Sequence, residues 1–314
     1  MTKKRNVIID CDPGIDDAFA IALALKAKEL NVLAIHTVAG NVSVHHTTRN
    51  TRGLVKLLGS HVEICMGAEA PLCAKQVLAA DIHGNNGFSG YQFADEELAE
   101  LSADSALESY YKKLSASEEL VDIIAVGPLT NLGVLLTAYP QLKSKIGTIS
   151  IMGGGIKGGN ITAAGEFNFY ADPEAAQIVF QSGVNLIMAG LDVTEKARLY
   201  EEEITKIEQT CGALGALLAT VVVPSLNRSL ERLGVKSTAP NDACAVLVLI
   251  EENLFEGKCL KVEIETGGNL TRGMSIADQR SHNREPGNAL VLLQVDDKRF
   301  RTVVCERLQQ ETVN

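Results

Sequence analysis

The chain has 314 residues, 46% of them hydrophobic, and a formal net charge of −10. This length and hydrophobic content suffice for a large core, and we expect one α/β domain over residues 1–314. The acidic balance argues against nucleic acid as a partner, because phosphate binding requires basic surface. No apolar run reaches the ~18 residues of a membrane span, and we expect neither a signal peptide nor a membrane partner.

The seven cysteines are scattered, contain no CxxC pair and mostly have apolar neighbours. This pattern is typical of reduced thiols in the core of a cytosolic protein. We therefore predict a cytoplasmic location and no disulfides.

Short apolar runs and helix-like stretches alternate along the chain. We predict strands at residues 7–9, 30–38, 62–65, 121–126, 146–152, 184–188, 260–265 and 288–295. We predict helices from residue 18, over 47–58 and 132–138, from Pro173 with Asp172 as N-cap, over 200–233 with a break at Pro224, over 243–250, and near the C-terminus. Repeated strand–turn–helix units predict an α/β fold with a mostly parallel central sheet and helices on both faces.

Four carboxylates lie within eight positions at the end of the first predicted strand: Asp10, Asp12, Asp16 and Asp17. Like charges this close repel each other unless a cation or shared protons neutralise them. Helix capping accounts for Asp16 and Asp17 but not for Asp10 and Asp12. Because open α/β sheets bind ligands at the carboxyl ends of their strands, we interpret the cluster as a cation site. Its all-oxygen donor set suits Ca²⁺ or Mg²⁺.

The segment DCDPGIDDA, residues 10–18, resembles the DxDPGxDDA signature of the calcium-dependent nucleoside hydrolases. Later motifs of that family match in order at residues 37–41, 126–131, 151–154, 166–168 and 171–176. Residues 37–44 and 47–50 are most similar to bacterial ribonucleoside hydrolases that accept purines and pyrimidines. The resemblance implies a Rossmann-like fold, Ca²⁺ as cofactor, and hydrolysis of purine and pyrimidine ribonucleosides to ribose and free base in nucleoside salvage. It also suggests a homotetramer or homodimer.

Carried over position by position, the resemblance implies a role for each matching residue. Asp12 would take a proton from the attacking water beside Ca²⁺, and Asn41 would help to place that water or the ribose. The Ca²⁺ ligands would be Asp12, Asp17, Asp242 and the main-chain carbonyl of Val126. Contacts to the substrate would come from Asp16, Asn41, His83, Met152, Asn160, Glu166, Asn168 and Asp242. Among these, Asp16 and Asn168 would hold the ribose 2′- and 3′-hydroxyls, Asn160 and Glu166 the 5′-hydroxyl, and His83 would lie near the base.

One position departs from the family pattern. Many members carry a histidine before the last calcium aspartate, proposed to protonate the departing purine, and this chain has Asn241 there. Asparagine cannot act as a general acid at neutral pH. Asn241 therefore joins the candidate catalytic set as a base contact, as the N-cap of the next helix, or as both. His83, Arg228, Arg232 or water are the alternative sources of leaving-group activation.

Two other functions remain open on the residues alone. A haloacid-dehalogenase-type phosphatase also places Asp-x-Asp after its first strand, but Asp16 and Asp17 have no role in that scheme. A nucleoside-binding protein with impaired catalysis would explain Asn241. One further histidine, His36, lies in a strand that reads as buried, and we predict that it is a hydrogen-bonded core residue.

Overall fold

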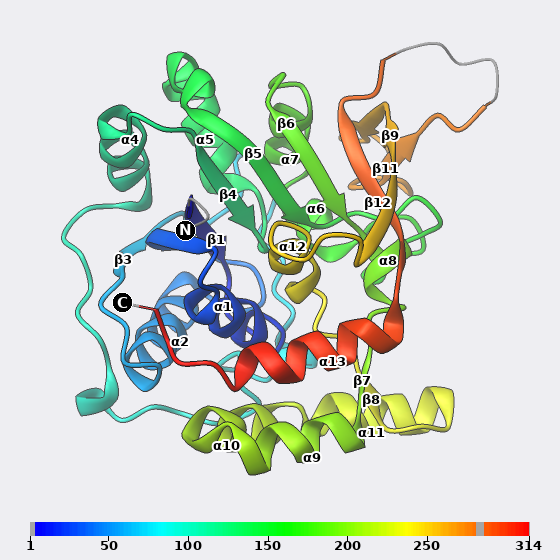
Figure 1. Cartoon of the computed structure of the whole chain (residues 1–314). Coiled ribbons are helices and arrows are strands. Elements are labelled where there is room, and N and C mark those ends of the chain that lie inside the picture. The colour runs from blue at the N-terminus through cyan, green and yellow to red at the C-terminus, as the bar shows by residue number, and fades with distance from the viewer. Residues whose placement is uncertain (1–3, 281–285, 314) are drawn as a thin grey trace.

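An eight-stranded sheet organises the chain in the computed structural model, which describes residues 4–280 and 286–313 (Figure 1). The strands follow one another in the order β3 (Glu63–Met66), β2 (Leu30–Thr37), β1 (Arg5–Cys11), β4 (Val121–Ala125), β5 (Ile146–Met152), β6 (Asn185–Ala189), β12 (Ala289–Val295) and β9 (Phe255–Leu260). Only the β12–β9 pair is antiparallel in this sheet. The predicted mostly parallel sheet is confirmed.

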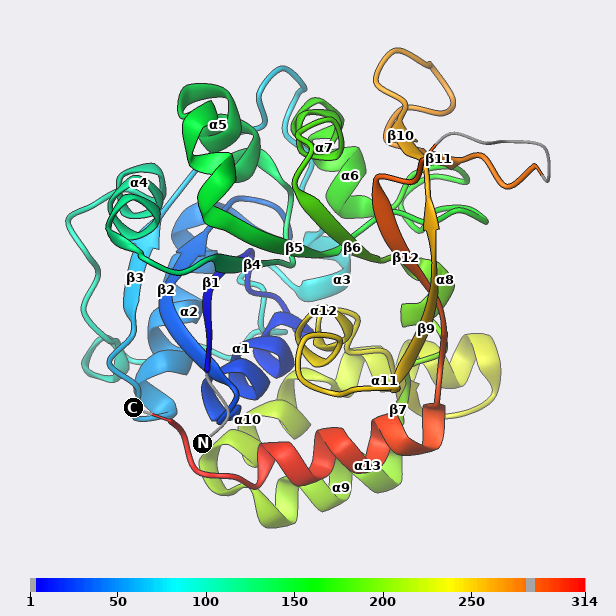
Figure 2. The same ribbon diagram turned by 45° about the horizontal axis from the view of Figure 1, so that its top comes forward.

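Helices cover both faces of the sheet, as predicted (Figure 2). One face carries α1 (Asp17–Lys26), α2 (Val44–Leu57), α12 (Ala243–Leu247) and α13 (Asp297–Leu308), and the other carries α4 (Ala106–Ala116), α5 (Thr130–Ala138) and α7 (Pro173–Phe180). Successive side chains of β1 point to opposite faces of the sheet, as in any β-strand. Val7 and Ile9 belong to the core around α1, whereas Ile8 belongs to the core around α4 and α5.

The remaining elements are shorter or lie outside the sheet. The helices are α3 (Ala80–His83), α6 (Phe167–Ala171), α8 (Leu191–Thr194), α9 (Glu201–Thr210), α10 (Gly212–Val221) and α11 (Val223–Leu233), with 3₁₀ turns at Asp95–Glu97 and Pro140–Lys145. Two small antiparallel pairs join β7 (Leu199–Tyr200) to β8 (Ser237–Thr238) and β10 (Val262–Ile264) to β11 (Ser275–Ala277). The predicted helical stretch 200–233 is therefore three helices, with the last break beside Pro224.

The predicted strand 260–265 is wrong as a single strand. β9 ends at Leu260 and pairs with β12, whereas β10 begins at Val262 and pairs with β11. The side chain of Asn288 explains the change of partner, because it accepts from the Val262 main-chain nitrogen at 2.8 Å and donates to the Val262 carbonyl at 2.9 Å. One side chain thus satisfies the backbone groups that would otherwise continue the ladder. The predicted helix 243–250 is also shorter, since α12 ends at Leu247.

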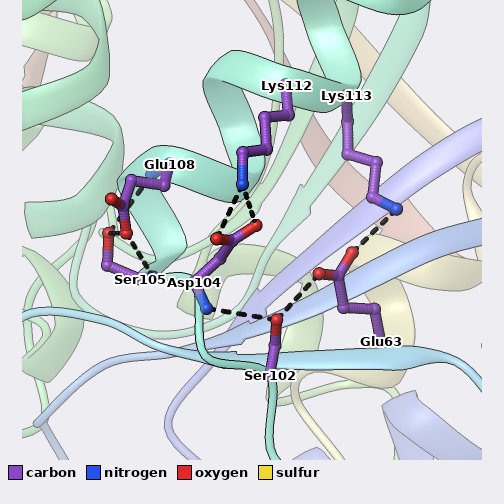
Figure 3. A network of polar contacts seen from close by, with 7 residues as sticks. All are labelled: Glu63, Ser102, Asp104, Ser105, Glu108, Lys112 and Lys113. Carbon is purple, nitrogen blue, oxygen red and sulfur yellow. Dashed lines mark hydrogen bonds and ion pairs between the residues drawn. The ribbon is translucent and has the colours of Figure 1, made fainter.

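A polar network on the surface holds α4 beside β3 (Figure 3). Glu63 of β3 forms an ion pair with Lys113 of α4 at 2.7 Å and accepts from Ser102 at 2.9 Å. Ser105 caps the helix through a reciprocal pair of bonds with Glu108. With α4 fixed in this way, its buried face presents a tyrosine to the end of β1, as described below.

All seven cysteines are free, as predicted. Four of them are buried in the core, but Cys73 and Cys259 are exposed and Cys211 is half-buried, so the prediction of core thiols holds only in part. Within the described ranges no single helix has the length and apolar content to cross a membrane. α10 and α11 together pass that test by length and composition alone, with a 45° bend between them.

Candidate active site

Asp12 follows β1 at the carboxyl edge of the sheet and is fully buried. The loop after β2, which carries Gly40 and Asn41, and the loop after β4, which carries Gly127, both contact its carboxylate. The main-chain nitrogen of Asn41 donates to Asp12 Oδ2 at 2.6 Å. A Cβ atom on Gly40 would lie 2.1 Å from that oxygen, and one on Gly127 would lie 2.7 Å from Asp12 Oδ1. Both loops reach the carboxylate only because glycine has no side chain.

The other oxygen of Asp12, Oδ1, is buried and has no hydrogen-bond partner among residues 4–280 and 286–313. A buried polar atom without a partner is costly. Burial and the neighbouring charge of Asp17 raise the pKa of the Asp12 carboxyl well above its ordinary value. This oxygen therefore requires a proton, a cation or a bound polar molecule.

Three further carboxylates lie beside Asp12. Oxygen atoms of Asp16, Asp17 and Asp242 approach within 4.8 Å of one another. Burial and negative neighbours raise the pKa of Asp17 to about 7 and that of Asp242 well above its ordinary value. Such a buried, all-oxygen cluster fits a hard divalent cation, whose charge would remove this repulsion.

Asn41 ties the loop after β2 to the segment after β1, which carries both Asp12 and Asp17. Its side-chain nitrogen donates to the Asp12 carbonyl at 3.1 Å and to Asp17 Oδ2 at 3.2 Å. Asp17 also accepts from the main-chain nitrogens of Asp12 and Gly14, at 3.2 and 2.9 Å. Asn41 therefore fixes the orientation of Asp17 as well as that of Asp12.

A cavity of about 290 Å³ opens next to this cluster. Of the residues proposed from the sequence, its walls include Asp16, Asn41, His83, Val126, Met152, Asn160, Glu166, Asn168, Asn241 and Asp242. Asp12 and Asp17 do not line it and are fully buried beside it. The structure thus brings all the candidate residues together at one edge of the sheet.

One wall is built around the start of α6. Glu166 caps this helix, accepting from the main-chain nitrogens of Gly154 at 2.8 Å and Asn168 at 3.0 Å. Burial raises the pKa of Glu166 to about 7. The side-chain nitrogen of Asn168 donates to the carbonyls of Val126 and Met152, at 3.1 and 3.0 Å. The Asn168 amide oxygen therefore remains an acceptor.

Asn160 lies on the same wall, where its Oδ1 accepts from the main-chain nitrogen of Phe167 at 2.9 Å. That bond ties the long loop after β5 to the first residue of α6. Its side-chain nitrogen remains a donor.

Asn241 is not the N-cap of α12, so that alternative is wrong. The cap position belongs to Asp242, and the Asn241 side-chain nitrogen instead donates to Asp16 Oδ2 at 3.1 Å. Across the cavity, His83 Nδ1 accepts from the main-chain nitrogen of Ile15 at 3.1 Å, and burial lowers the pKa of His83. A neutral imidazole whose Nδ1 accepts carries its hydrogen on Nε2, which makes His83 a donor.

Asp10 lies behind the cluster, buried, with Tyr110 of α4 and Asn131 of α5 as partners. The Tyr110 hydroxyl donates to Asp10 Oδ2 at 2.9 Å, and Asn131 donates to the same oxygen at 3.1 Å. Burial raises the pKa of Asp10 to about 7. No sequence motif marked Tyr110, because α4 contributes it from an unrelated part of the chain.

His36 is buried, as predicted, but the prediction of a hydrogen-bonded histidine is wrong. Neither ring nitrogen has a partner among the described residues, and burial lowers the pKa of His36 to about 3. Its ring instead packs edge-on against Tyr110, with centroids 4.1 Å apart. The sequence indicated that His36 lies in a buried strand, but it did not indicate that the ring packs against Tyr110.

Residues 7–302 match the family model described as inosine-uridine preferring nucleoside hydrolase. The chain belongs to this family. It is 38% identical over 309 residues to the pyrimidine-specific ribonucleoside hydrolase RihA of Escherichia coli O1:K1, covering 96% of this chain and 98% of that protein. The family assignment predicted from the motifs is confirmed.

Solved structures agree with the family assignment. The plant nucleoside hydrolase PpNRh1 superposes with a TM-score of 0.89 at 27% identity, over 97% of this chain and 99% of that one. A purine-preferring ribonucleoside hydrolase from Gardnerella vaginalis gives a TM-score of 0.89 at 28% identity, over 97% and 98%. These neighbours share the Rossmann-like nucleoside hydrolase fold that we predicted.

The family assignment decides between the functional classes that the sequence left open. The chain is a ribonucleoside hydrolase and therefore an enzyme, which sets aside both the phosphatase and the non-catalytic binding protein. The family is metal-dependent, and the acidic cluster of Asp16, Asp17 and Asp242 brings together carboxylates that could hold a metal ion.

Proposed function

We propose that this nucleoside hydrolase cleaves the N-glycosidic bond of purine and pyrimidine ribonucleosides, with Asp12 as the general base and Ca²⁺ as the metal. The observation that carries the proposal is the buried Asp12 Oδ1, which has no partner in the described part of the chain and lies beside three further carboxylates. The names of the relatives point to both classes of base, since RihA is called pyrimidine-specific and the Gardnerella protein purine-preferring.

The metal would be held by the carboxylates of Asp12, Asp17 and Asp242 and by the Val126 carbonyl. A high number of oxygen ligands, with some flexibility, is typical of Ca²⁺ sites, whereas Mg²⁺ usually keeps several waters. When bound, the cation would fix the ribose hydroxyls and lower the pKa of a neighbouring water.

Asp12 is prepared for the transfer of one proton. Its Oδ2 is engaged by the Asn41 main-chain nitrogen, which fixes the carboxylate plane, while Oδ1 is left to accept the proton of the attacking water. As the C1′–N bond breaks, positive charge develops on the ribosyl ring. The buried carboxylates of the site supply the negative field that stabilises it.

The ribose would lie across the wall formed by α6 and the cluster. Asp16 and the free amide oxygen of Asn168 can accept from the 2′- and 3′-hydroxyls, and Glu166 and Asn160 would receive the 5′-hydroxyl. Met152 would pack against the sugar. Asn241 would hold Asp16 in place through their mutual hydrogen bond, and Asp242 would contact both metal and ribose.

The test is ribose release from inosine, adenosine, uridine and cytidine, measured with Ca²⁺ and with a chelator. We expect chelator-sensitive release and a loss of ~10²–10⁴-fold in kcat for Asp12→Asn. Calcium content by atomic emission separates a lost base from a lost ion. Near-normal turnover in that variant would show that Asp12 is not the base.

Four further properties remain predictions: the single domain over residues 1–314, the cytoplasmic location, the role in salvage and the homo-oligomeric state.

A further inference from the structure

Three consecutive main-chain nitrogens at the start of the loop after β5 each donate to a buried side chain. The three bonds run from Gly154 to Glu166 Oε2 at 2.8 Å, from Gly155 to Ser275 Oγ at 2.9 Å, and from Ile156 to Asp192 Oδ2 at 2.6 Å. The accepting side chains belong to the N-cap of α6, to β11 and to α8. Three separate parts of the chain therefore fix the point at which this loop leaves the sheet.

Ser275 binds both backbone groups of Gly155. Its hydroxyl accepts from the Gly155 nitrogen and donates to the Gly155 carbonyl, the second bond at 3.0 Å. A serine hydroxyl has a single proton, so this pairing uses its only donor. Gly155 is closely surrounded, since a Cβ atom there would lie 2.4 Å from the Gly158 carbonyl oxygen. Loss of the hydroxyl would deprive two backbone groups of a buried residue of this partner.

The strand pair β10–β11, which carries Ser275, lies outside the central sheet and is attached to α6 and α7 (Figure 2). Strand β10 packs against α7. Between the two strands, Arg272 forms an ion pair with Glu174 of α7 at 2.8 Å. Gly273 lies against α6, where an added Cβ would come within 2.6 Å of the Tyr170 Cα atom. Ser275 thus connects a pair of strands fixed to α6 and α7 with the loop after β5.

The loop that these bonds hold reaches the cavity. Asn160 and Ile161 line the cavity, whereas Ser275 and Asp192 do not. The side chain of Asn160 is also tied to α6 through its bond from the Phe167 nitrogen. The place of Asn160 in the cavity wall therefore depends on how the loop is held at both of its ends.

We propose that Ser275 is a positioning residue: through Gly155 it fixes the loop that carries Asn160, so that the β10–β11 pair supports the part of the cavity that receives the 5′ end of the nucleoside. Asp192 has the same role through Ile156. The inference rests on the proposed function, which assigns the 5′-hydroxyl to Asn160 and Glu166. Both positioning residues act through the main chain.

The first experiment compares uridine and inosine with their 5′-deoxy forms, which lack only the 5′-hydroxyl. We expect the wild type to cleave the 5′-deoxy forms with kcat/KM lower by ~10-fold or more. Ser275→Ala should lower kcat/KM ~10-fold for uridine and inosine and at most ~2-fold for the 5′-deoxy forms, because a displaced contact matters only to a substrate that makes it. Equal losses on both kinds of substrate would overturn the inference, as would a wild type that does not distinguish them.

Two variants of Asp192 test the same loop from another element. Asp192→Ala removes the acceptor for the Ile156 nitrogen and should give the same selective loss. Asp192→Asn keeps an acceptor oxygen there and should stay within ~2-fold of the wild type on every substrate. If Asp192→Ala lowers cleavage of both kinds of substrate equally, the bond to Ile156 does not act on the 5′ end and the inference is wrong.

Ser109→Ala is the matched control for Ser275→Ala. It removes an equally buried serine hydroxyl from α4, outside the walls of the cavity. We expect it to leave the ratio between uridine and 5′-deoxyuridine unchanged. A change in that ratio as large as the one in Ser275→Ala would show a general effect of losing a buried hydroxyl and would contradict the proposed role.

Hydrogen exchange followed by mass spectrometry gives a readout that does not depend on turnover. Ser275→Ala should accelerate exchange ~10-fold or more in peptides that cover residues 154–165 and leave β4 and β5 unchanged, because only the loop loses its attachment. Unchanged exchange in the loop would overturn the inference. Faster exchange throughout the sheet would also overturn it, since the serine would then support the whole fold.

The same data separate this inference from the proposed function. If the wild type releases ribose from none of the nucleosides, the proposed function fails. If it releases ribose and Ser275→Ala leaves the preference for the 5′-hydroxyl intact, only the role of Ser275 is wrong.

Discussion

The side-chain nitrogen of Asn241 donates to Asp16 Oδ2 at 3.1 Å, so the residue that replaces the family histidine contacts the aspartate that we propose for the ribose. We predict that Asn241→Ala lowers kcat/KM by a similar factor, about 5–10-fold, on purine and pyrimidine nucleosides alike, because the loss of one hydrogen bond to Asp16 affects the sugar common to both. Steady-state kinetics on inosine and uridine check this. A loss confined to purines would show that Asn241 acts on the base instead.

Metal removal should destabilise the protein more at pH 8 than at pH 5. In the metal-free protein, the raised pKa values of Asp12, Asp17 and Asp242 mean that the folded state retains protons that the unfolded state has released. Stability is therefore lost as pH rises from about 4, with the Asp17 contribution falling through about pH 7. The cation that we propose would replace those protons. The difference in melting temperature between the protein with Ca²⁺ and the protein with a chelator should be several degrees larger at pH 8 than at pH 5. An equal difference at both pH values would contradict this.

Gly40→Ala should abolish most of the activity while leaving the sheet folded. The added Cβ would lie 2.1 Å from Asp12 Oδ2, so the loop or the carboxylate must move. We expect a loss of at least ~10²-fold in kcat, since small displacements of catalytic groups are costly. Gly267→Ala is the control, because its Cβ would meet only Glu265 Oε1 at 3.7 Å. Ribose-release assays and circular dichroism of both variants separate displacement from unfolding.

His36 should make the protein sensitive to acid. Its folded pKa of about 3 lies below the ordinary value of 6.5, so the unfolded state binds the proton first as pH falls. The contribution of His36 is complete above about pH 6.5 and is lost progressively toward pH 3. His36→Phe keeps a ring against Tyr110 and removes the titration. In thermal melts, the melting temperature of the variant minus that of the wild type should be larger at pH 5 than at pH 7.5. An equal difference at both pH values would exclude the effect.

Local chemistry explains where sequence-based prediction succeeded. The Asp172-Pro173 pair predicted the start of α7, and the Asp172 side chain does accept from the Ala175 main-chain nitrogen at 3.1 Å. Strand β5 has the predicted bounds, because its β-branched and apolar residues lie between the 3₁₀ turn Pro140–Lys145 and the glycines that follow Met152. The carboxylates after β1 likewise predicted the position of the site, since their spacing is unfavourable without a ligand.

The failures have a common physical origin in partners that are distant in the sequence. Asn288 decides where β9 ends, although it lies 26 residues from the backbone that it binds. Tyr110 reaches Asp10 from 100 residues away. Ile82 of α3 and Ser225 of α11 also line the cavity without belonging to any motif, and only the fold brings them to the carboxylates.

Two parts of the cavity wall are attached to the molecule in different ways. The carboxylates lie on turns that leave the central strands, so a change there disturbs the sheet itself. Another part of the wall comes from α11, which follows a break at Val222 and comprises only the eleven residues Val223–Leu233. On the proposed function, substitutions in this one peripheral helix would reshape the cavity and leave the carboxylates in place.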